Sequence, residues 1–137
     1  MNNKDLNGVR ERAVLPVIKK VDTVERKQVT AGSATETQVL LGSADGAPNF
    51  AMRRFIMGVG GGMPLHTNSV EHEQYVLRGK GRVGIGDRVF EVSADHVLFI
   101  PAGVPHFYEV IEAPFEFLCI VPNRPDQLTI LDPPGCG

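Results

Sequence analysis

The chain has 137 residues, a formal net charge of −2 at pH 7 and no run of Lys and Arg longer than two residues. This length allows one domain with a single core, and the charge argues against nucleic acid as a partner, because phosphate recognition needs a basic face. Since no apolar stretch suits a signal peptide or a membrane span, we expect a cytoplasmic protein with no membrane partner.

The first 33 residues are expected to form an arm outside the main domain. After ten polar residues, the segments 13–21 and 24–30 are short and contain several β-branched residues, with Asp22-Thr23 between them. This pattern is a weak strand signal. We therefore place residues 1–33 at the periphery of the fold.

Residues 34–125 are expected to form a single all-β domain. Short apolar runs follow one another at a spacing of roughly 8 to 12 residues, with Gly, Pro, Asn or Asp between them. The runs are QVLLG, FAMRRFIMGV, QYVLRG, RVGIG, RVFEV, HVLFI, HFYEVI and FEFLCIV. The Gly-Asp pair within Ile85–Arg88 predicts a tight hairpin turn. A closed barrel or jelly roll would hide the edges of so many short strands.

The chain ends in a proline-rich segment, residues 126–137, which predicts a C-terminal tail. The tail contains Cys136, and the other cysteine, Cys119, lies in an apolar run. Two cysteines are too few for a disulfide framework, so we expect free thiols and a reducing compartment.

Three histidines are placed so that they can converge inside a barrel. Side chains at i and i+2 share one face of a strand, so His66 projects with Asn68, and His72 projects with Gln74. Likewise, His106 shares a face with the tyrosine at 108. A single histidine in such a strand is more often an ordinary hydrogen-bonded residue. Three histidines at the starts of expected strands, two of them close to a proline, favour a metal site.

The sequence around these histidines resembles the cupin superfamily. The stretch Gly61–Gly79, GGMPLHTNSVEHEQYVLRG, resembles the first cupin motif, and Pro101–His106, PAGVPH, resembles the second. The flanks Ala47–Phe55 and Phe117–Pro122 also look like the small single-domain bacterial cupins, and in particular the manganese-binding type with the motif H-x-H-P-x-E-H-E. The resemblance implies a double-stranded β-helix, or jelly-roll barrel.

The resemblance also implies a metal site. It assigns His66, His72 and His106 as ligands and places Asn68 where the family has a second histidine. An amide oxygen is a weaker donor than imidazole, so Asn68 either completes a looser site or lies behind the ligands while water takes its place. The expected cofactor is a divalent transition metal, most readily Mn or Fe, with Ni, Cu or Zn as alternatives.

Two smaller departures from the family pattern concern a turn and the second motif. Asp95-His96 replaces the usual Gly-Asp turn, so Asp95 is expected to adopt a left-handed conformation. His96 is expected to be a turn residue without a ligand role. Val110 stands where the second motif usually has Asn.

Strand parity and the resemblance together nominate the pocket wall. Of the pair Arg53-Arg54, the resemblance selects Arg53 as the inward residue. A buried guanidinium needs an anionic partner, which implies either a carboxylate of the protein or an anionic ligand. We assign a substrate-orienting, catalytic role to Arg53 and Tyr108. The expected substrate-binding residues are Phe55, Met57, Gln74, Phe117 and Cys119.

The carboxylates near the histidines are expected to point away from the site. By parity, Glu73, Glu109 and Glu116 lie opposite His72, His106 and Phe117 respectively. A site with neutral ligands only would leave the ion its full charge and would favour a chelating oxygen ligand such as a 2-oxo acid, a diketone or a catecholate.

These observations favour a metal-dependent, oxygenase-type enzyme that acts on a small chelating oxygenated or aromatic substrate. The alternative is a non-catalytic module that binds a small anion, because the asparagine at the second ligand position weakens the site. In similar small cupins an N-terminal arm pairs with a neighbouring subunit, so the resemblance also implies a homodimer in which residues 1–33 exchange.

Overall fold

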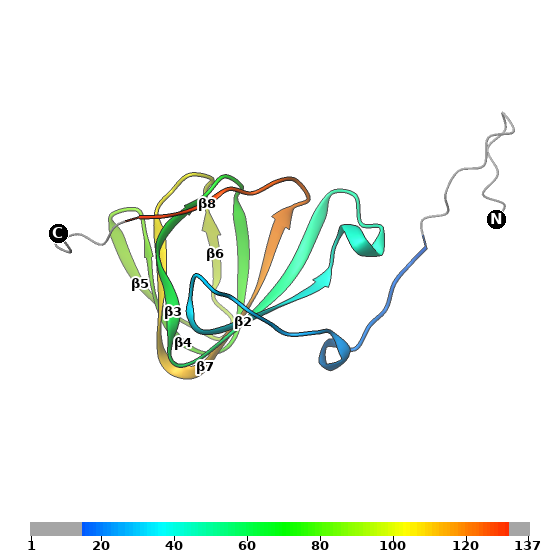
Figure 1. The fold of residues 1–137 in the computed structure, drawn as a ribbon. Helices are drawn as coiled ribbons and strands as arrows, with labels where there is room; N and C mark the ends of the chain where they lie inside the picture. The colour runs from blue at the N-terminus through cyan, green and yellow to red at the C-terminus, as the bar shows by residue number, and fades with distance from the viewer. Residues whose placement is uncertain (1–14, 132–137) are drawn as a thin grey trace, which may run out of the picture.

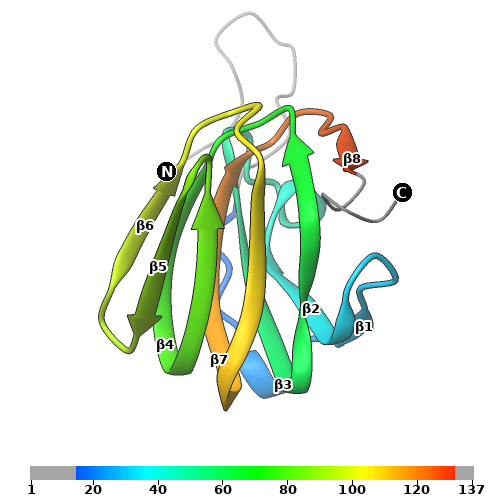
Figure 2. The same cartoon turned by 90° about the vertical axis from the view of Figure 1, so that its left-hand side faces the viewer.

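The protein is built from antiparallel β-strands that curl into a barrel (Figures 1 and 2). The structure, a computed structural model, describes residues 15–131. Its strands are β1 (Lys27–Gln28), β2 (Ser33–Leu41), β3 (Phe50–Asn68), β4 (His72–Ile85), β5 (Arg88–Ser93), β6 (Val97–Ile100), β7 (His106–Pro122) and β8 (Leu128–Ile130). The sheet order is β1-β2-β3-β7-β4-β5, with β6 on β4 and β8 on β3. The predicted all-β jelly-roll class is confirmed.

Helical structure within residues 15–131 is limited to two single 3-10 turns, η1 (Val21–Thr23) and η2 (Ser43–Asp45). No helix in this part of the chain is both long and apolar enough to cross a membrane.

Three long, bent strands give the barrel its shape. The predicted runs QYVLRG and RVGIG are one strand, β4, and HFYEVI and FEFLCIV are likewise joined in β7. Each long strand changes register near its middle and folds back at the same end of the barrel (Figure 2). Gly62 and Gly79 lie at these bends with φ of 150° and 78°, where a Cβ would meet the carbonyl oxygens of the facing strand. Because the bends lie at one end of the barrel, the first and last residues of each long strand lie together at the other end.

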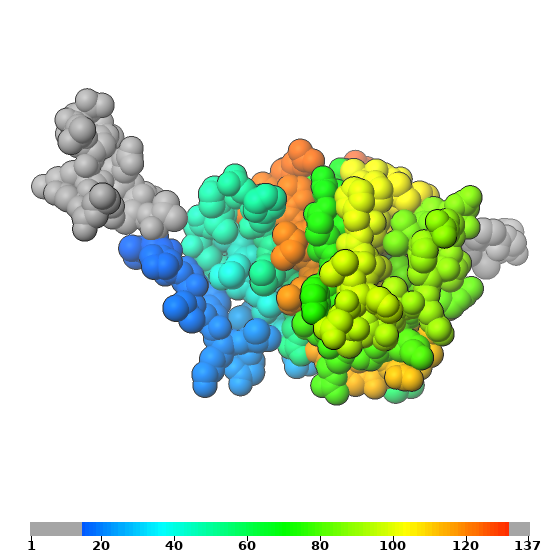
Figure 3. All heavy atoms as spheres, turned by 180° about the vertical axis from the view of Figure 1, so that it is seen from behind, coloured from blue at the N-terminus to red at the C-terminus, as the bar shows by residue number. Residues whose placement is uncertain are grey.

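The first described residues, drawn in blue, lie outside the barrel (Figure 3), whereas Val29 reaches the lining of the interior cavity. Of the two weak strand segments expected here, only Lys27–Gln28 forms a strand, and it pairs with β2. The side chain of Gln38 holds the segment by donating hydrogen bonds of 2.9 Å to the carbonyls of Val21 and Val24. The rest of the predicted arm, residues 1–14, lies outside the described residues.

The region expected to be a tail contributes a strand to the barrel. Leu128, Thr129 and Ile130 form β8 and pair with the last three residues of β3. The sequence assignment missed this strand because a three-residue apolar and β-branched run between prolines is too short to stand out from a proline-rich segment. Cys136 lies outside the described residues.

The sheet has a closely packed inner face. Met57, Val76, Phe115, Phe117 and Cys119 are at most 2% exposed and belong to one apolar core cluster. Cys119 is a free buried thiol, as expected.

The two expected turns are also confirmed. Ile85 and Arg88 are paired across the β4–β5 hairpin, and Asp95 has a φ of 72°. His96 accepts a hydrogen bond of 2.9 Å at Nδ1 from the backbone N–H of Ser93, which fits a turn residue.

Candidate metal centre

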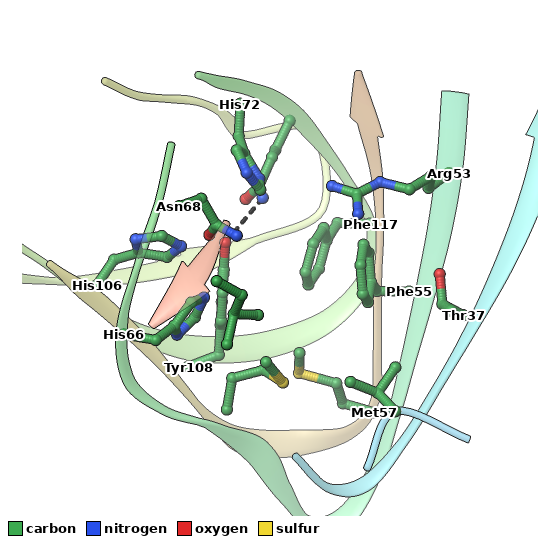
Figure 4. Close-up of a pocket in the computed structure, with 14 residues that line it drawn as sticks. Thr37, Arg53, Phe55, Met57, His66, Asn68, His72, His106, Tyr108 and Phe117 are labelled. Atoms are coloured by element: carbon green, nitrogen blue, oxygen red, sulfur yellow. Dashed lines mark hydrogen bonds between the residues drawn. The ribbon is translucent and has the colours of Figure 1, made fainter. Parts of the chain in front are cut away.

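Three histidines from three strands meet at the end of the barrel opposite the bends. His66 lies near the end of β3, His72 starts β4 and His106 starts β7. The ring centroids of His66 and His106 are 4.1 Å apart, and those of His72 and His106 are 5.8 Å apart. His66 and His106 are also paired directly across the β3–β7 ladder. Sequence-distant imidazoles therefore gather in one place, as Figure 4 shows.

Backbone carbonyls fix the orientation of two of these rings. Nδ1 of His66 lies 2.7 Å from the carbonyl oxygen of Pro64, and Nδ1 of His106 lies 2.9 Å from that of Val104. A carbonyl oxygen only accepts, so the proton of each neutral ring is on Nδ1 and the lone pair is on Nε2. Such a bond on the far nitrogen is typical of histidines that bind metals.

Burial keeps the imidazoles neutral. Burial, together with the nearby positive charge of Arg53, lowers the pKa of His72 to about 3. Burial also lowers the pKa of His106 to about 4, against an opposing contribution from the hydrogen bond to Val104. The pKa of His66 is lowered for the same reason. All three rings are therefore uncharged near neutral pH, as metal ligands must be.

Asn68 turns its amide oxygen toward the same space. Its Nδ2 donates a hydrogen bond of 2.8 Å to the carboxylate of Asp126, a residue just before β8. The amide oxygen, Oδ1, is buried and has no hydrogen-bond partner. The asparagine that replaces the second family histidine thus presents an oxygen rather than an N–H group to the cavity.

Unsatisfied polar atoms are concentrated at this site. Within residues 15–131, the buried side-chain polar atoms without a partner are Thr37 Oγ1, Arg53 Nε, Asn68 Oδ1, His72 Nε2 and His106 Nε2. Every one of these residues lines the same cavity. An orphaned buried polar atom costs about 1–3 kcal/mol, so the concentration indicates a place prepared for a ligand.

The donor set fits a divalent transition metal in its chemistry. It offers two to three imidazole nitrogens and one amide oxygen, which such ions accept. Within residues 15–131, no group of three or more His, Cys, Asp or Glu side chains already has the spacing to hold an ion. Within that part of the chain the histidines alone therefore do not have the spacing of a preformed centre, and the unpartnered oxygen of Asn68 is a further candidate donor.

The cavity has a volume of about 170 Å³ and combines a polar end with an aromatic wall. Phe55, Phe117 and Tyr108 form a stack, with ring centroids 5.3 and 5.2 Å apart and planes 19° from parallel in both pairs. The complete lining is Val29, Thr37, Arg53, Phe55, Met57, Met63, His66, Asn68, His72, Gln74, His106, Tyr108, Phe117 and Leu128. Among residues 15–131, therefore, no carboxylate lines the cavity.

All the nominated site residues except Cys119 line this cavity. Cys119 lies behind the lining, where its sulfur is 3.3 Å from Arg53 Nη2, 3.3 Å from His72 Nδ1 and 3.5 Å from Gln74 Nε2. Gln74 also donates a hydrogen bond of 2.8 Å to the hydroxyl oxygen of Tyr108. Burial raises the pKa of the Tyr108 phenol, which leaves its proton free to be donated into the cavity.

Of the two alternatives expected for Arg53, a protein carboxylate or an anionic ligand, the carboxylate is not found among the described residues. Arg53 lies over the ring of Phe55, 5.1 Å from its centroid, and its hydrogen-bond partner is the sulfur of Cys119. Glu73 and Glu109 are exposed, as parity predicted. Glu116 also lies away from the cavity, but it is 4% exposed rather than solvated, because Arg54 and Arg78 enclose it.

Sequence reasoning missed several residues of the site. Thr37 and Met63 are inward residues on strands already expected, so parity could have found them. Val29 and Leu128 come from the supposed arm and tail, and Asp126 contacts Asn68 across 58 residues of sequence. No local pattern signals such a contact.

The comparisons with known proteins agree with this architecture. Residues 53–121, half of the chain, match the family model described as the cupin domain. The chain belongs to the cupin family. No curated protein matches it.

Among solved structures, the cupin chain is similar to the polyketide cyclase RemF from Streptomyces resistomycificus, with 29% identity, a TM-score of 0.74 and coverage of 85% of this chain and 88% of that chain. A cupin 2 domain-containing protein from Halorhodospira halophila has 29% identity and a TM-score of 0.67, covering 72% and 71%. Oxalate decarboxylase from Bacillus subtilis, at 19% identity, a TM-score of 0.64 and coverage of 74% and 28%, shares the fold alone. The manganese-binding type stays a prediction.

Proposed function

We propose that this cupin is a metal-dependent enzyme of the oxygenase type that acts on a small, chelating oxygenated or aromatic substrate. The observation that carries the proposal is the convergence of three buried polar atoms without a partner, Asn68 Oδ1, His72 Nε2 and His106 Nε2, on one cavity. Together with His66 they would hold a divalent ion, with Mn or Fe as the leading candidates and Ni, Cu or Zn as alternatives. Such an ion supplies a Lewis-acidic and, for Mn or Fe, redox-active centre.

The protein's own groups would orient the substrate. The Arg53 guanidinium lacks an anionic partner within residues 15–131, so it is available to a carboxylate or enolate oxygen. The phenol of Tyr108 stays protonated and can donate to a second substrate oxygen. The cavity volume of about 170 Å³ is close to the roughly 150 Å³ that encloses a benzene molecule, so it accommodates about one ring.

The lack of a carboxylate in the cavity lining within residues 15–131 distinguishes oxidative chemistry from reactions that begin with proton abstraction. Proton abstraction from carbon needs a base within hydrogen-bond reach of the substrate, and the cavity wall contains none of the carboxylates nearest to the histidines. This favours oxidative chemistry at a redox-active ion over isomerase, epimerase or hydrolase chemistry.

A second candidate is ring closure of a linear polyketone. It is favoured by the likeness to the polyketide cyclase RemF over most of both chains. A polyketone also presents pairs of oxygen atoms that chelate, so both candidates use the same site. They differ in the ion they need, because ring closure by loss of water requires no redox change and would proceed with Zn, whereas oxygenation would not.

One experiment separates the two candidates. Protein loaded with Fe(II), Mn(II) or Zn(II) is incubated with a catechol, a diketone and a linear triketone, while O2 uptake and product masses are recorded. O2 uptake with a gain of oxygen only in the Fe or Mn forms supports the oxygenase. Loss of one water molecule in the Zn form supports the cyclase. Saturable ligand binding without either product would instead indicate the non-catalytic, anion-binding module.

We also propose a homodimer. Large apolar side chains on the outer face of the sheet are exposed, including Val97 at 72% and Phe99 at 58%, and Leu15 and Ile18 of the N-terminal segment are exposed at 68% and 97%. A second copy would cover such a face. Size-exclusion chromatography with light scattering should give a dimer, and a variant lacking residues 1–24 should dissociate. A dimer that survives this truncation would exclude strand exchange by the arm.

A further inference from the structure

We infer that Asp126 is a positioning residue that makes the Asn68 amide a metal ligand. The inference rests on the proposed metal centre and adds a residue from outside the cupin motifs. Asp126 precedes β8 and lies 58 positions after Asn68 in the sequence. It does not line the cavity.

The carboxylate of Asp126 decides which end of the amide faces the cavity. An ionised carboxylate is an acceptor only, so it must face the NH2 group of Asn68 rather than its oxygen. The Nδ2–Oδ2 bond of 2.8 Å therefore directs Oδ1 to the opposite side, where it is buried without a partner. Asn68 is 5% exposed, so water has little access to hold the amide in either orientation.

The same bond strengthens a weak donor. Donation from an amide N–H to a carboxylate polarises the amide and increases the negative charge on its oxygen. Carboxylates that accept from the far nitrogen of a ligand histidine have this effect at metal sites. Asp126 would give Asn68 the corresponding support, which offsets the loss of the imidazole that the family pattern has at this position.

The other oxygen of Asp126 fixes the carboxylate itself. Oδ1 accepts 2.9 Å from the backbone N–H of Ser69 and 3.2 Å from the Ser69 hydroxyl. The Ser69 hydroxyl oxygen in turn accepts 2.8 Å from the backbone N–H of Gln127. This bracket ties the segment before β8 to the end of β3, so the position of Asp126 is set independently of Asn68.

The bracket also provides a matched control. The Ser69→Ala variant loses two of the bracket's hydrogen bonds but retains the Asp126–Asn68 bond. The Asp126→Ala variant loses the bond to Asn68 and the two bonds that Ser69 donates, and it retains the bond from Gln127 to Ser69. A purely structural role in holding the chain segment should affect the two variants alike, whereas a role through the amide should affect Asp126→Ala alone.

The test measures Co²⁺ binding to the full-length chain. Visible absorption reports the bound ion, and competition with a chelator gives the affinity. We expect Asp126→Ala to weaken Co²⁺ binding about 10- to 100-fold and Ser69→Ala to change it less than about twofold. In an Asn68→Ala background, the Asp126 substitution should have no further effect, because the double-mutant cycle then lacks the group through which Asp126 acts. Asp126→Asn, which keeps the side-chain shape, should give an intermediate loss.

Three results would overturn the inference. Equal losses in Ser69→Ala and Asp126→Ala would mean that the bracket is only structural. An undiminished effect of Asp126→Ala in the Asn68→Ala background would mean that Asp126 acts by its charge. A wild-type-like affinity of Asp126→Ala would remove its role while the metal centre stands, whereas a wild-type chain that binds no Co²⁺ would overturn the centre as well.

A measurement on the metal-free protein tests the hydrogen bond directly. In nuclear magnetic resonance spectra of ¹⁵N-labelled protein, the side-chain NH2 of Asn68 should be protected from solvent exchange in the wild type and in Ser69→Ala. It should lose this protection in Asp126→Ala. Unprotected NH2 protons in the wild type would show that the bond does not exist in solution.

Discussion

Two successive arginines on β3 occupy opposite faces of the sheet and have opposite environments. Arg54, on the outer face, donates to the side-chain oxygen of Gln38 at 2.9 Å and forms an ion pair with Glu116. Arg78 lies 3.6 Å from the other oxygen of Glu116. Arg53, on the inner face, has only the sulfur of Cys119 at 3.3 Å, and its Nε has no partner.

The comparison separates polar groups that stabilise the fold from those that await a ligand. On the outer face, each charge of the Arg54–Glu116 cluster has a partner, and Gln38 extends the cluster to the backbone of the N-terminal segment. On the inner face, five buried polar atoms of residues that line the cavity have no hydrogen-bond partner, namely Thr37 Oγ1, Arg53 Nε, Asn68 Oδ1, His72 Nε2 and His106 Nε2. A fully connected buried network gives rigidity, while an unfinished one costs free energy. We therefore infer that the unpartnered polar atoms of the inner face are retained to bind a ligand in the cavity.

The largest expected effect is a difference in stability between substitutions on the outer and the inner face of the sheet. Glu116→Ala should lower the free energy of unfolding by up to about 3 kcal/mol, because it removes the anionic partner of Arg54, whose side chain is only 18% exposed. Arg53→Met should change it by less than about 1 kcal/mol, because it removes a charge that already lacks a partner, but it should abolish binding of an anionic ligand. Urea denaturation and ligand titration measure both. Equal destabilisation by the two substitutions would refute the distinction.

The next effect concerns the metal. His106→Ala should weaken Co²⁺ binding by more than about 100-fold, since it removes the ring that lies nearest to both other histidines. His96→Ala is the matched control, because His96 is exposed and bonded to Ser93 in a turn. Elemental analysis and Co²⁺ titration provide the readout. Loss of metal in the His96 variant would mean that binding is not confined to the cavity.

The inner face was largely predictable from the sequence, and the outer cluster was not. Alternation along strands places His72, Gln74 and Val76 on one face whatever the rest of the chain does. The three buried residues confirm it, at 6%, 5% and 0% exposure. Glu116 was expected only to point away from the site, because parity tells which face a residue takes but not what covers that face. Here Arg54 and Arg78 cover Glu116.

The site was predictable where it depends on strands and not where it depends on loops. The ligand histidines lie within or beside the cupin motifs, so the resemblance located them. Asp126 and Leu128 reach the site through a β8 that only three residues define. Their contacts depend on how the chain returns after β7, and a single sequence holds no signal for that path.

Acidification should weaken the metal-free barrel through the same inner groups. In the folded state the pKa of His72 is lowered to about 3 and that of His106 to about 4, both mainly by burial. The unfolded chain, with histidine pKa near 6.5, therefore binds more protons as pH falls. The contribution of these neutral rings to stability is complete above about pH 6.5 and is lost toward pH 4, by about 1.4 kcal/mol per histidine and pH unit.

Thermal unfolding of chelator-treated protein between pH 7 and 5 checks this expectation. Glu73 acts in the opposite direction, because a hydrogen bond with Glu71 raises its pKa to about 7. The Glu73→Gln background removes that contribution. Within it, His106→Leu should flatten the dependence of the melting temperature on pH. An unchanged slope would mean that His106 is already accessible to protons in the folded state.

The smallest expected effect tests the one ligand that departs from the family pattern. Asn68→His should tighten Co²⁺ binding by only about tenfold, because imidazole is the better donor while Asp126 already orients the amide. Asn68→Leu, which is close in size but has no oxygen, should loosen it. Competition titrations with a chelator resolve both changes. If Asn68→Leu binds Co²⁺ as tightly as the wild type, the amide oxygen is not a metal ligand. The partner of this buried oxygen would then be a group of the substrate rather than an ion.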